Sequence, residues 1–142
     1  MVEKLEVAID VIIHATEEPS KFFESFEEMF GLDSSDFSIQ HTTGHFENPI
    51  TILSARLSKE QASKFVEKLT KSISKEQLDQ MVSEIEERTV DSRYHIRIDK
   101  QELVNKKIAF NEKDAVKIKI HTPVYNKKDT IKIFTQIFQA AT

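Results

Sequence analysis

The chain has 142 residues, a formal net charge of −4, 39% hydrophobic and 31% charged residues, which suits a single domain over residues 1–142 with an ordinary core. No apolar run approaches the roughly 20 residues of a membrane span, and the acidic, alternating N-terminus is unlike a signal peptide, so we expect a cytoplasmic protein without membrane contact. Because the chain has no cysteine, the sequence excludes disulfides, thiolate metal sites and a cysteine nucleophile.

The first elements are a strand and an amphipathic helix. Apolar residues at every second position over 5–13 predict a half-buried strand. Thr16 is expected to cap the helix that follows, since the acidic residues and proline at 17–19 are favoured in a first turn. Phenylalanines at helical spacing form its apolar stripe, and Gly31 is expected to end it in a left-handed conformation.

A β-hairpin is predicted next. Residues 37–43 and 50–57 have strand character, and the heptapeptide GHFENPI lies between them. Gly44 is expected at a positive φ, and the Asn48–Pro49 pair is expected to hold the chain extended as it enters the second strand.

Turn chemistry leaves His45 and Phe46 unexplained. We expect Phe46 to staple the connection to the core. His45, in a loop beside a basic sheet, suits contact with a phosphate or a base.

The second half alternates between helices and strands. Two helices are expected to start at capping boxes, which are Ser58 with Gln61 and Ser74 with Gln77. Residues 94–98 and 116–121 predict two strands joined by a segment that begins as a short helix, and a last helix starts near Asn126, with Ile131 on its buried face. The order βαββααββα predicts an α+β two-layer sandwich, with a mostly antiparallel sheet and helices on one face.

Basic charge is concentrated in the second half. Residues 1–50 hold two lysines against eleven acidic residues, whereas residues 101–142 hold eight lysines against four. Strand alternation places several basic side chains on the face of the sheet that points away from the helices. They are Arg56, Arg97, Lys117 and Lys119, edged by His95 and His121. This stripe suits a polyanion, although the same residues also serve simply to solubilise an exposed sheet face.

Three motifs carry a family resemblance. HATE at 14–17, GHFENPI at 44–50 and IRIDKQ at 96–101 together resemble an archaeal family of RNA-binding domains predicted to be exosome subunits. The resemblance implies the fold of the fifth large-subunit ribosomal protein. It marks three groups of residues: His14, Thr16 and Glu17; Gly44, His45, Asn48 and Pro49; and Arg97, Asp99, Lys100 and Gln101. Many members carry glycine at the position of Glu47, so the segment 99–101 is the better candidate for a functional surface.

These observations predict a non-catalytic module that binds structured RNA, within RNA processing or beside the exosome, with no cofactor and no metal. The expected RNA contacts are Arg56, Arg97, Lys100, Lys117 and Lys119 to phosphates, with Gln101 and His45 to sugars or bases. Asp99 is expected to cap a short helix whose exposed first turn, with Lys100, forms a phosphate site.

Other functions stay open. The acidic first half suits docking of a basic partner, and a homodimer is also left open. A weak phosphoesterase is a third alternative, with His45 or His14 near Glu17 as base and acid and Lys100 on the phosphate. Among the five histidines no i, i+4 pair lies on a predicted helix and no i, i+2 pair occurs, but the five are free to converge in space.

Overall fold

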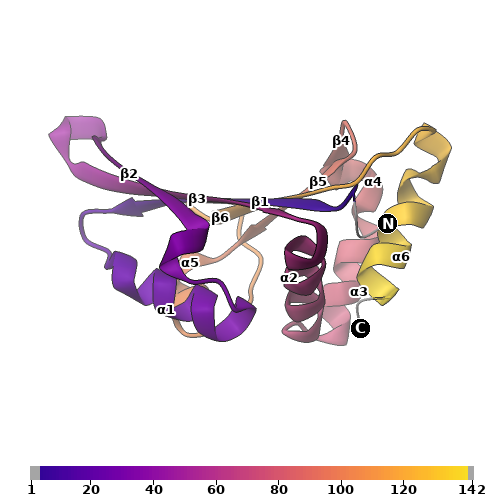
Figure 1. Cartoon of the computed structure of the whole chain (residues 1–142), viewed down its shortest axis with the longest axis horizontal. Coiled ribbons are helices and arrows are strands. Elements are labelled where there is room, and N and C mark those ends of the chain that lie inside the picture. Colours follow the sequence, from indigo (N-terminus) through magenta and orange to yellow (C-terminus); the bar gives the residue numbers. More distant parts are fainter. Residues whose placement is uncertain (1–3, 141–142) are drawn as a thin grey trace. The chain divides into compact units, whose positions relative to one another are not determined.

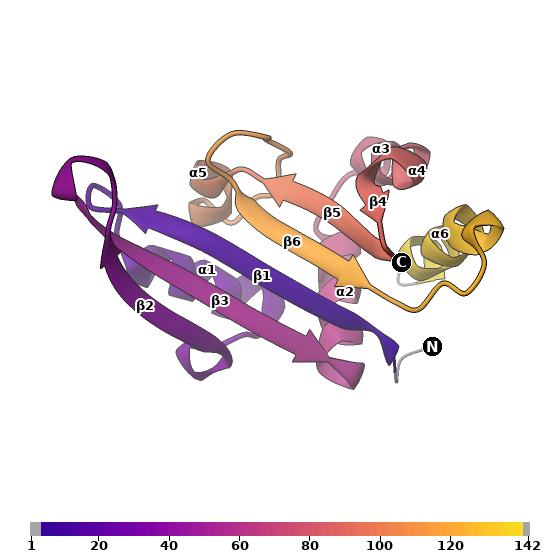
Figure 2. The ribbon, with the colours of Figure 1, turned by 90° about the horizontal axis from the view of Figure 1, so that it is seen from above.

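The computed structural model describes residues 4–140, apart from the side chains of His45 and Ala140. The chain forms an α+β fold with a six-stranded antiparallel sheet in the order β2-β3-β1-β6-β5-β4 (Figures 1 and 2). The strands are β1 (Glu6–His14), β2 (Phe37–Thr43), β3 (Pro49–Ser58), β4 (Thr89–Val90), β5 (Arg93–Ile98) and β6 (Val116–His121). The predicted fold class is confirmed.

The helices are α1 (Pro19–Phe30), α2 (Lys59–Lys71), α3 (Lys75–Ser83), α4 (Ile85–Arg88), α5 (Lys100–Val104) and α6 (Thr130–Ala140). Three 3₁₀ turns lie in the connections: η2 (Ser34–Asp36) between α1 and β2, η3 (His45–Glu47) between β2 and β3, and η4 (Lys127–Asp129) between β6 and α6. Within residues 4–140, no helix is both long enough and apolar enough to cross a bilayer.

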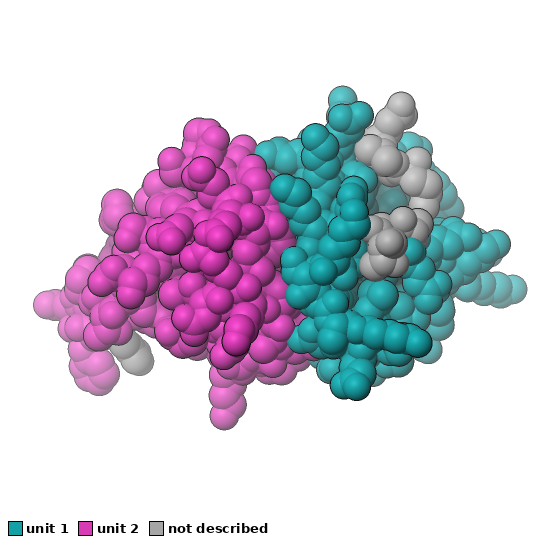
Figure 3. All heavy atoms as spheres, turned by 90° about the horizontal axis from the view of Figure 1, so that it is seen from below, with its two compact units in different colours: residues 1–7, 57–96, 119–142 teal, residues 8–56, 97–118 magenta. Residues whose placement is uncertain are grey.

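The chain divides into two compact units (Figure 3). Unit 1 comprises residues 1–7, 57–96 and 119–142, and unit 2 comprises residues 8–56 and 97–118. Each unit joins segments that are far apart in the sequence, so neither is a continuous stretch of chain. One domain over residues 1–142 stays a prediction.

The core of unit 2 follows the predicted alternation. Ile9, Val11 and Ile13 are buried on β1, whereas the residues between them are partly or fully exposed. On α1, Phe26 is fully buried and its ring centroid lies 4.8 Å from that of Phe37 on β2. Pairing of aromatic rings therefore joins the helix to the sheet in this unit.

The two ends of α1 differ in how well the sequence predicts them. Gly31 ends the helix with a φ of 70°, as expected, and its N–H donates to the carbonyl of Glu27. At the start, Glu18 is the N-cap residue, with no side-chain cap bond, and Pro19 is the first helical residue. The prediction that Thr16 caps α1 is wrong, because proline fixes the first helical position further along the chain.

Unit 1 is built around a buried tyrosine. Tyr94 on β5 is fully buried, and its ring centroid lies 4.9 Å from that of Phe138 and 5.9 Å from that of Phe134, both on α6. Its hydroxyl donates to the carbonyl of Met81 at 3.0 Å. Burial raises the pKa of Tyr94 above its ordinary range, so the hydroxyl stays protonated and keeps this bond.

Helix starts in unit 1 confirm one capping box and contradict the other. Ser74 and Gln77 cap each other's backbone N–H groups, as predicted. Ser58 makes no side-chain cap bond, so the box predicted there is wrong. The predicted burial of Ile131 is also wrong, since this side chain is 48% exposed.

Candidate functional site

The sheet surface opposite the helices carries the predicted basic positions. On β3, Leu53, Ala55 and Leu57 are buried and Arg56 is exposed. The same alternation leaves Arg97 exposed on β5 and Lys117 and Lys119 exposed on β6. The predicted exposure of all four is therefore confirmed. Of these residues, Arg56, Arg97 and Lys117 belong to unit 2 and Lys119 belongs to unit 1.

Both arginines have weakly held acidic neighbours in unit 2. The nearest nitrogen of Arg56 lies 3.4 Å from Oδ1 of Asp10, which also accepts from the Ser54 hydroxyl at 2.7 Å. Nε of Arg97 lies 3.9 Å from the Glu112 carboxylate. Exposed pairs of this kind contribute about 0–1 kcal/mol, so exchanging one for a phosphate costs little.

The predicted edge histidines belong to unit 1 and are half-buried. Nδ1 of His121 lies 3.3 Å from Oε1 of Glu6. His95 also has an intermediate exposure on β5. Neither ring is therefore presented fully to solvent.

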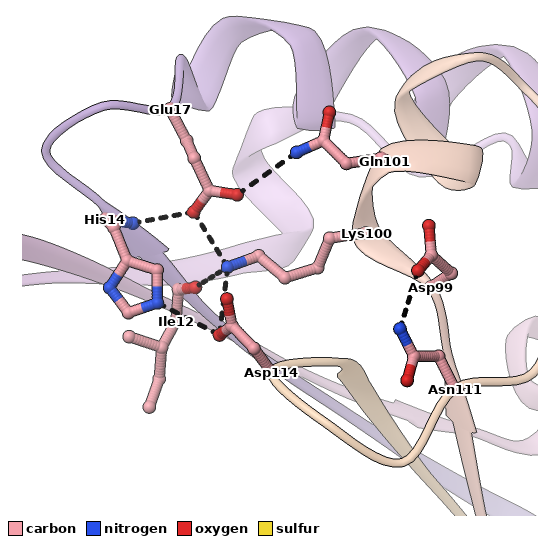
Figure 4. A network of polar contacts seen from close by, with 8 residues as sticks. All are labelled: Ile12, His14, Glu17, Asp99, Lys100, Gln101, Asn111 and Asp114. Carbon is pink, nitrogen blue, oxygen red and sulfur yellow. Dashed lines mark hydrogen bonds and ion pairs between the residues drawn. The ribbon is translucent and has the colours of Figure 1, made fainter.

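The first and third sequence motifs meet in unit 2 around a buried ammonium group (Figure 4). The Lys100 side chain is 3% exposed, and its Nζ donates to the carbonyl of Ile12 at 2.5 Å and to Oε1 of Glu17 at 2.8 Å. Nζ also lies 3.3 Å from Oδ1 of Asp114, and Nε2 of His14 lies 3.0 Å from the same oxygen. We call Lys100, Glu17, Asp114 and His14 the Lys100 cluster.

The backbone of the HATE motif helps to hold the Lys100 cluster. The Glu17 N–H donates to the carbonyl of His14 at 2.9 Å, and Oε1 of Glu17 accepts from the His14 N–H at 2.9 Å. This reciprocal turn fixes the carboxylate that faces Nζ of Lys100. Thr16, the remaining polar member of the motif, lies exposed.

The electrostatics of the Lys100 cluster favour the charged form of Asp114. Burial opposes ionisation of Asp114, but hydrogen bonds from His14 and Lys100, with the positive charge of Lys100, hold its pKa below the ordinary value. A buried ammonium group is tolerated only when it is paired and hydrogen-bonded, and here three oxygens surround it. The arrangement therefore ties three chain segments together.

The structure corrects the role predicted for Lys100. Its ammonium group points inward and is already surrounded by protein oxygens. The prediction that it lies exposed is wrong, and the inward-pointing ammonium group no longer supports the phosphate contact expected for it. Gln101 next to it is exposed, and its amide nitrogen lies 3.4 Å from Oε2 of Glu17.

Asp99 caps α5 as predicted, since its Oδ2 accepts from the Glu102 N–H at 2.8 Å. Its Oδ1 accepts from the Asn111 side chain at 2.7 Å, and this bond and the cap lower the pKa of Asp99. The Asp99 carboxylate already accepts from an N–H group at the start of α5, where its negative charge would repel a phosphate. The phosphate site expected there is therefore not supported.

Sequence reasoning missed Asp114 and Asn111. Both lie in the segment between α5 and β6, where no periodic pattern assigns a neighbour. The backbone of Asp114 has a φ of 45°, which is uncommon for this residue type. The only indication in the sequence was that this segment contains polar residues able to hydrogen-bond with Asp99 and Lys100.

The hairpin connection, residues 44–48, differs from its prediction. Gly44 does not have a positive φ. Phe46 and Glu47 have positive φ values instead, of 56° and 59°. Phe46 is 91% exposed, so the expected staple to the core is wrong. β3 begins at Pro49, one residue before the start predicted for this strand. The predicted contact by the His45 side chain falls outside the described part of the chain.

Gly44 instead sits where side-chain space is limited. Its N–H donates to the carbonyl of Asn48 at 2.7 Å, which closes the turn. A Cβ at this position would lie 3.3 Å from Cγ2 of Ile50.

Among the side chains that the structure describes, no group of three or more His, Asp or Glu residues is arranged to hold a metal ion.

Comparisons with known proteins agree with the fold and with the family resemblance. A family model described as RNA binding matches residues 6–122. RNA-binding protein PAB1135 of Pyrococcus abyssi is 30% identical over 129 residues, which cover 86% of this chain and 84% of that protein.

Crystal structures of archaeal DUF54 proteins share the fold. Protein AF2318 from Archaeoglobus fulgidus has a TM-score of 0.77 at 24% identity, covering 93% of this chain and 97% of that chain. Protein SSO0741 from Sulfolobus solfataricus has a TM-score of 0.76 at 22% identity, covering 96% of this chain and 99% of that chain. By the extent of the family match, the chain belongs to the RNA-binding family that this model describes.

Proposed function

We propose that this chain is a non-catalytic module that binds structured RNA through the basic side chains of its open sheet face. The observation that carries the proposal is the exposure of Arg56, Arg97 and Lys117 on strands of unit 2, in a member of a family described as RNA binding. Lys119, on the part of β6 that belongs to unit 1, is exposed as well.

The binding mechanism is electrostatic and follows the shape of the RNA backbone. Arginine and lysine neutralise phosphates and release condensed counterions, which is the main source of affinity for nucleic acid backbones. The carboxylates beside Arg56 and Arg97 are held by weak surface pairs, so phosphate oxygens can replace them. The guanidinium groups also suit bidentate contact with a phosphate.

The chemistry of the open face argues for backbone contact over base stacking on the strands. Apart from Arg56, the outward positions along β2 and β3 are uncharged polar or aliphatic, and the register pairs Gln40 with Ile52 and Thr42 with Ile50. Phe, Tyr and Trp are missing from the outward positions of β1, β2 and β3 in the described chain. A sheet that stacks bases needs aromatic side chains at such positions.

The Lys100 cluster supports this face indirectly. Lys100 joins β1 and the HATE turn to α5, which directly follows Arg97 and its strand. The Asn111 N–H donates to the carbonyl of Arg97 at 3.1 Å, so the same region also holds the backbone at this arginine. We infer that the cluster positions Arg97 without contacting RNA. Action within RNA processing or beside the exosome is the finer part of the proposal and rests on the family resemblance.

The test compares two pairs of substitutions with the same charge change. Arg97→Gln with Lys117→Gln removes two cations from the open face, and Lys64→Gln with Lys68→Gln removes two exposed cations from α2. Fluorescence anisotropy with a labelled RNA hairpin should show roughly tenfold weaker binding for the first pair and less than about twofold for the second.

Equal binding by the two variants would show that the basic residues only solubilise the sheet. The acidic first half would then become the place to look for a partner.

A further inference from the structure

The tip of the β2–β3 hairpin presents an aromatic ring to solvent. The tip, residues 44–48, joins Thr43 of β2 to Pro49 of β3, which pair with each other in the register. Phe46 at this tip is 91% exposed. Figures 1 and 2 show the connection at the end of its hairpin, beyond helices α1 and α5 of the same unit.

Backbone preference does not account for this ring. Phe46 has φ 56° and ψ 30°, a left-handed conformation that is costly for a bulky side chain. Two hydrogen bonds hold the turn: the Gly44 N–H donates to the Asn48 carbonyl at 2.7 Å, and the Glu47 N–H donates to the Gly44 carbonyl at 3.2 Å. Costly backbone conformations held by their surroundings are concentrated at functional sites.

Packing does not account for the ring either. Phe22, Phe26 and Phe37 of unit 2 are buried, whereas Phe46 leaves most of its apolar surface in water. Single exposed apolar side chains are common on protein surfaces, but one that sits on a costly backbone conformation at a hairpin tip suits contact with a partner.

The charge of the hairpin narrows the choice of partner. Over residues 37–58, the charged side chains are Glu47 at the tip and Arg56 far from it, with histidines left neutral. A ring beside a carboxylate is poorly suited to a phosphate but well suited to the uncharged face of a base. Arg56, at the other end of β3, supplies the attraction for the backbone.

We propose that Phe46 stacks on an unpaired base of the bound RNA, an inference that rests on the proposed RNA-binding function. In a paired helix the faces of the bases are covered by their neighbours, so an aromatic side chain needs a bulged or looped-out base. The open sheet face then binds the backbone of the structured part, and the hairpin tip selects RNA that carries an unpaired nucleotide nearby. The tip therefore gives the protein a preference for RNA with an unpaired base, which phosphate contacts by the basic residues alone do not provide.

The probes are two RNA hairpins, closed by the same tetraloop of stacked bases, that differ in one position of the stem. One is fully paired in its stem, and the other carries a single bulged 2-aminopurine, whose fluorescence is quenched by stacking. The variants are Phe46→Ala, the conservative Phe46→Tyr, and Tyr125→Ala as a control, because Tyr125 is an aromatic residue of unit 1 that is 87% exposed.

The inference predicts that Phe46→Ala weakens binding to the bulged hairpin by at least about fivefold and abolishes the quenching. Its binding to the fully paired hairpin should match that of the parent. Phe46→Tyr should keep both the affinity and the quenching, and Tyr125→Ala should bind like the parent.

Three results would overturn the inference. The first is parent-like binding of Phe46→Ala to the bulged RNA, and the second is an equal loss on both RNAs. The third is a Phe46→Ala protein whose only change is in its self-association, measured by sedimentation, since the ring would then contact a second copy. Failure of the parent chain to bind either hairpin would overturn the proposed function together with this inference, and it is visible before any variant is made.

Discussion

Nζ of Lys100 and Oε1 of Glu17 lie 2.8 Å apart, although 83 residues separate them in the chain. The contact joins the HATE turn after β1 to the start of α5, and the lysine side chain is 3% exposed. Two motifs that look like surface signatures in the sequence are thus partners in a buried ion pair. Their immediate role is to hold the strand ends and loops of unit 2 in place.

Stability should depend strongly on Lys100. Lys100→Met leaves the Glu17 carboxylate, whose side chain is 15% exposed, and the Ile12 carbonyl without their buried donor. Breaking a buried ion pair from one side costs about 3–5 kcal/mol. Urea unfolding should show this loss for Lys100→Met and less than about 0.5 kcal/mol for the exposed control Lys107→Met.

RNA binding by the folded fraction of Lys100→Met gives a second readout. Binding should persist, because the ammonium group faces the protein interior. A variant of unchanged stability that had lost RNA binding would show instead that Lys100 contacts RNA directly.

The cap of α5 should give a stability contribution that depends on pH. Hydrogen bonds from Asn111 and from the Glu102 N–H lower the pKa of Asp99 in the folded state. A lowered folded-state pKa means that the stabilisation is complete above the unfolded pKa of about 3.9 and is lost as pH falls through the folded value. Asp99→Ala should cost about 1 kcal/mol at pH 7.

Urea titrations of Asp99→Ala and the parent from pH 7 to pH 2.5 would measure this trend. The gap in unfolding free energy should stay constant down to about pH 4.5 and narrow below it. A gap that widened on acidification would contradict the assigned direction.

The hairpin tip should respond to glycine in a position-specific way. Glu47 has a φ of 59°, so Glu47→Gly relieves a left-handed strain and should stabilise the protein by about 0.5–1 kcal/mol. Gly44 has no positive φ, and an added Cβ would lie 3.3 Å from the Ile50 side chain and at an ordinary contact distance of 3.8 Å from the Asn48 carbonyl oxygen. Gly44→Ala should therefore change the free energy of unfolding by less than about 1 kcal/mol.

Thermal and urea unfolding of these two variants test the observed turn against the one predicted from sequence. A large loss of unfolding free energy in Gly44→Ala, together with no change in Glu47→Gly, would indicate that Gly44 has the positive φ predicted from the sequence. We expect instead that Glu47→Gly is stabilised and that Gly44→Ala changes little.

The sequence predicted the parts of the fold that depend on local patterns. Period-two alternation identified β2 and β6 at their observed bounds, and the Ser74–Gln77 box identified the start of α3. The outward register of Arg56 and Lys117 followed from the same alternation. These features depend on neighbours within a few residues, so one sequence is enough to specify them.

The features that sequence reasoning missed depend on contacts between distant segments. Lys100 lies at a helix start, where a lysine is normally solvated, and only the approach of Glu17 and Asp114 makes its burial favourable. Local preference predicts the positive φ of this turn at Gly44, because glycine adopts a positive φ at the lowest cost in free energy. The turn places that conformation on Phe46 and Glu47, against the local preference of both residues.

The most direct test of the central claim is the salt dependence of RNA binding by the parent chain. Three or four phosphate contacts from Arg56, Arg97, Lys117 and Lys119 predict that a plot of log affinity for a structured RNA hairpin against log salt has a slope of about −2 to −4. The same plot for Arg97→Gln with Lys117→Gln should be shallower by about 1.5–2. A slope near zero, or an identical slope for that variant, would contradict RNA binding through the open sheet face.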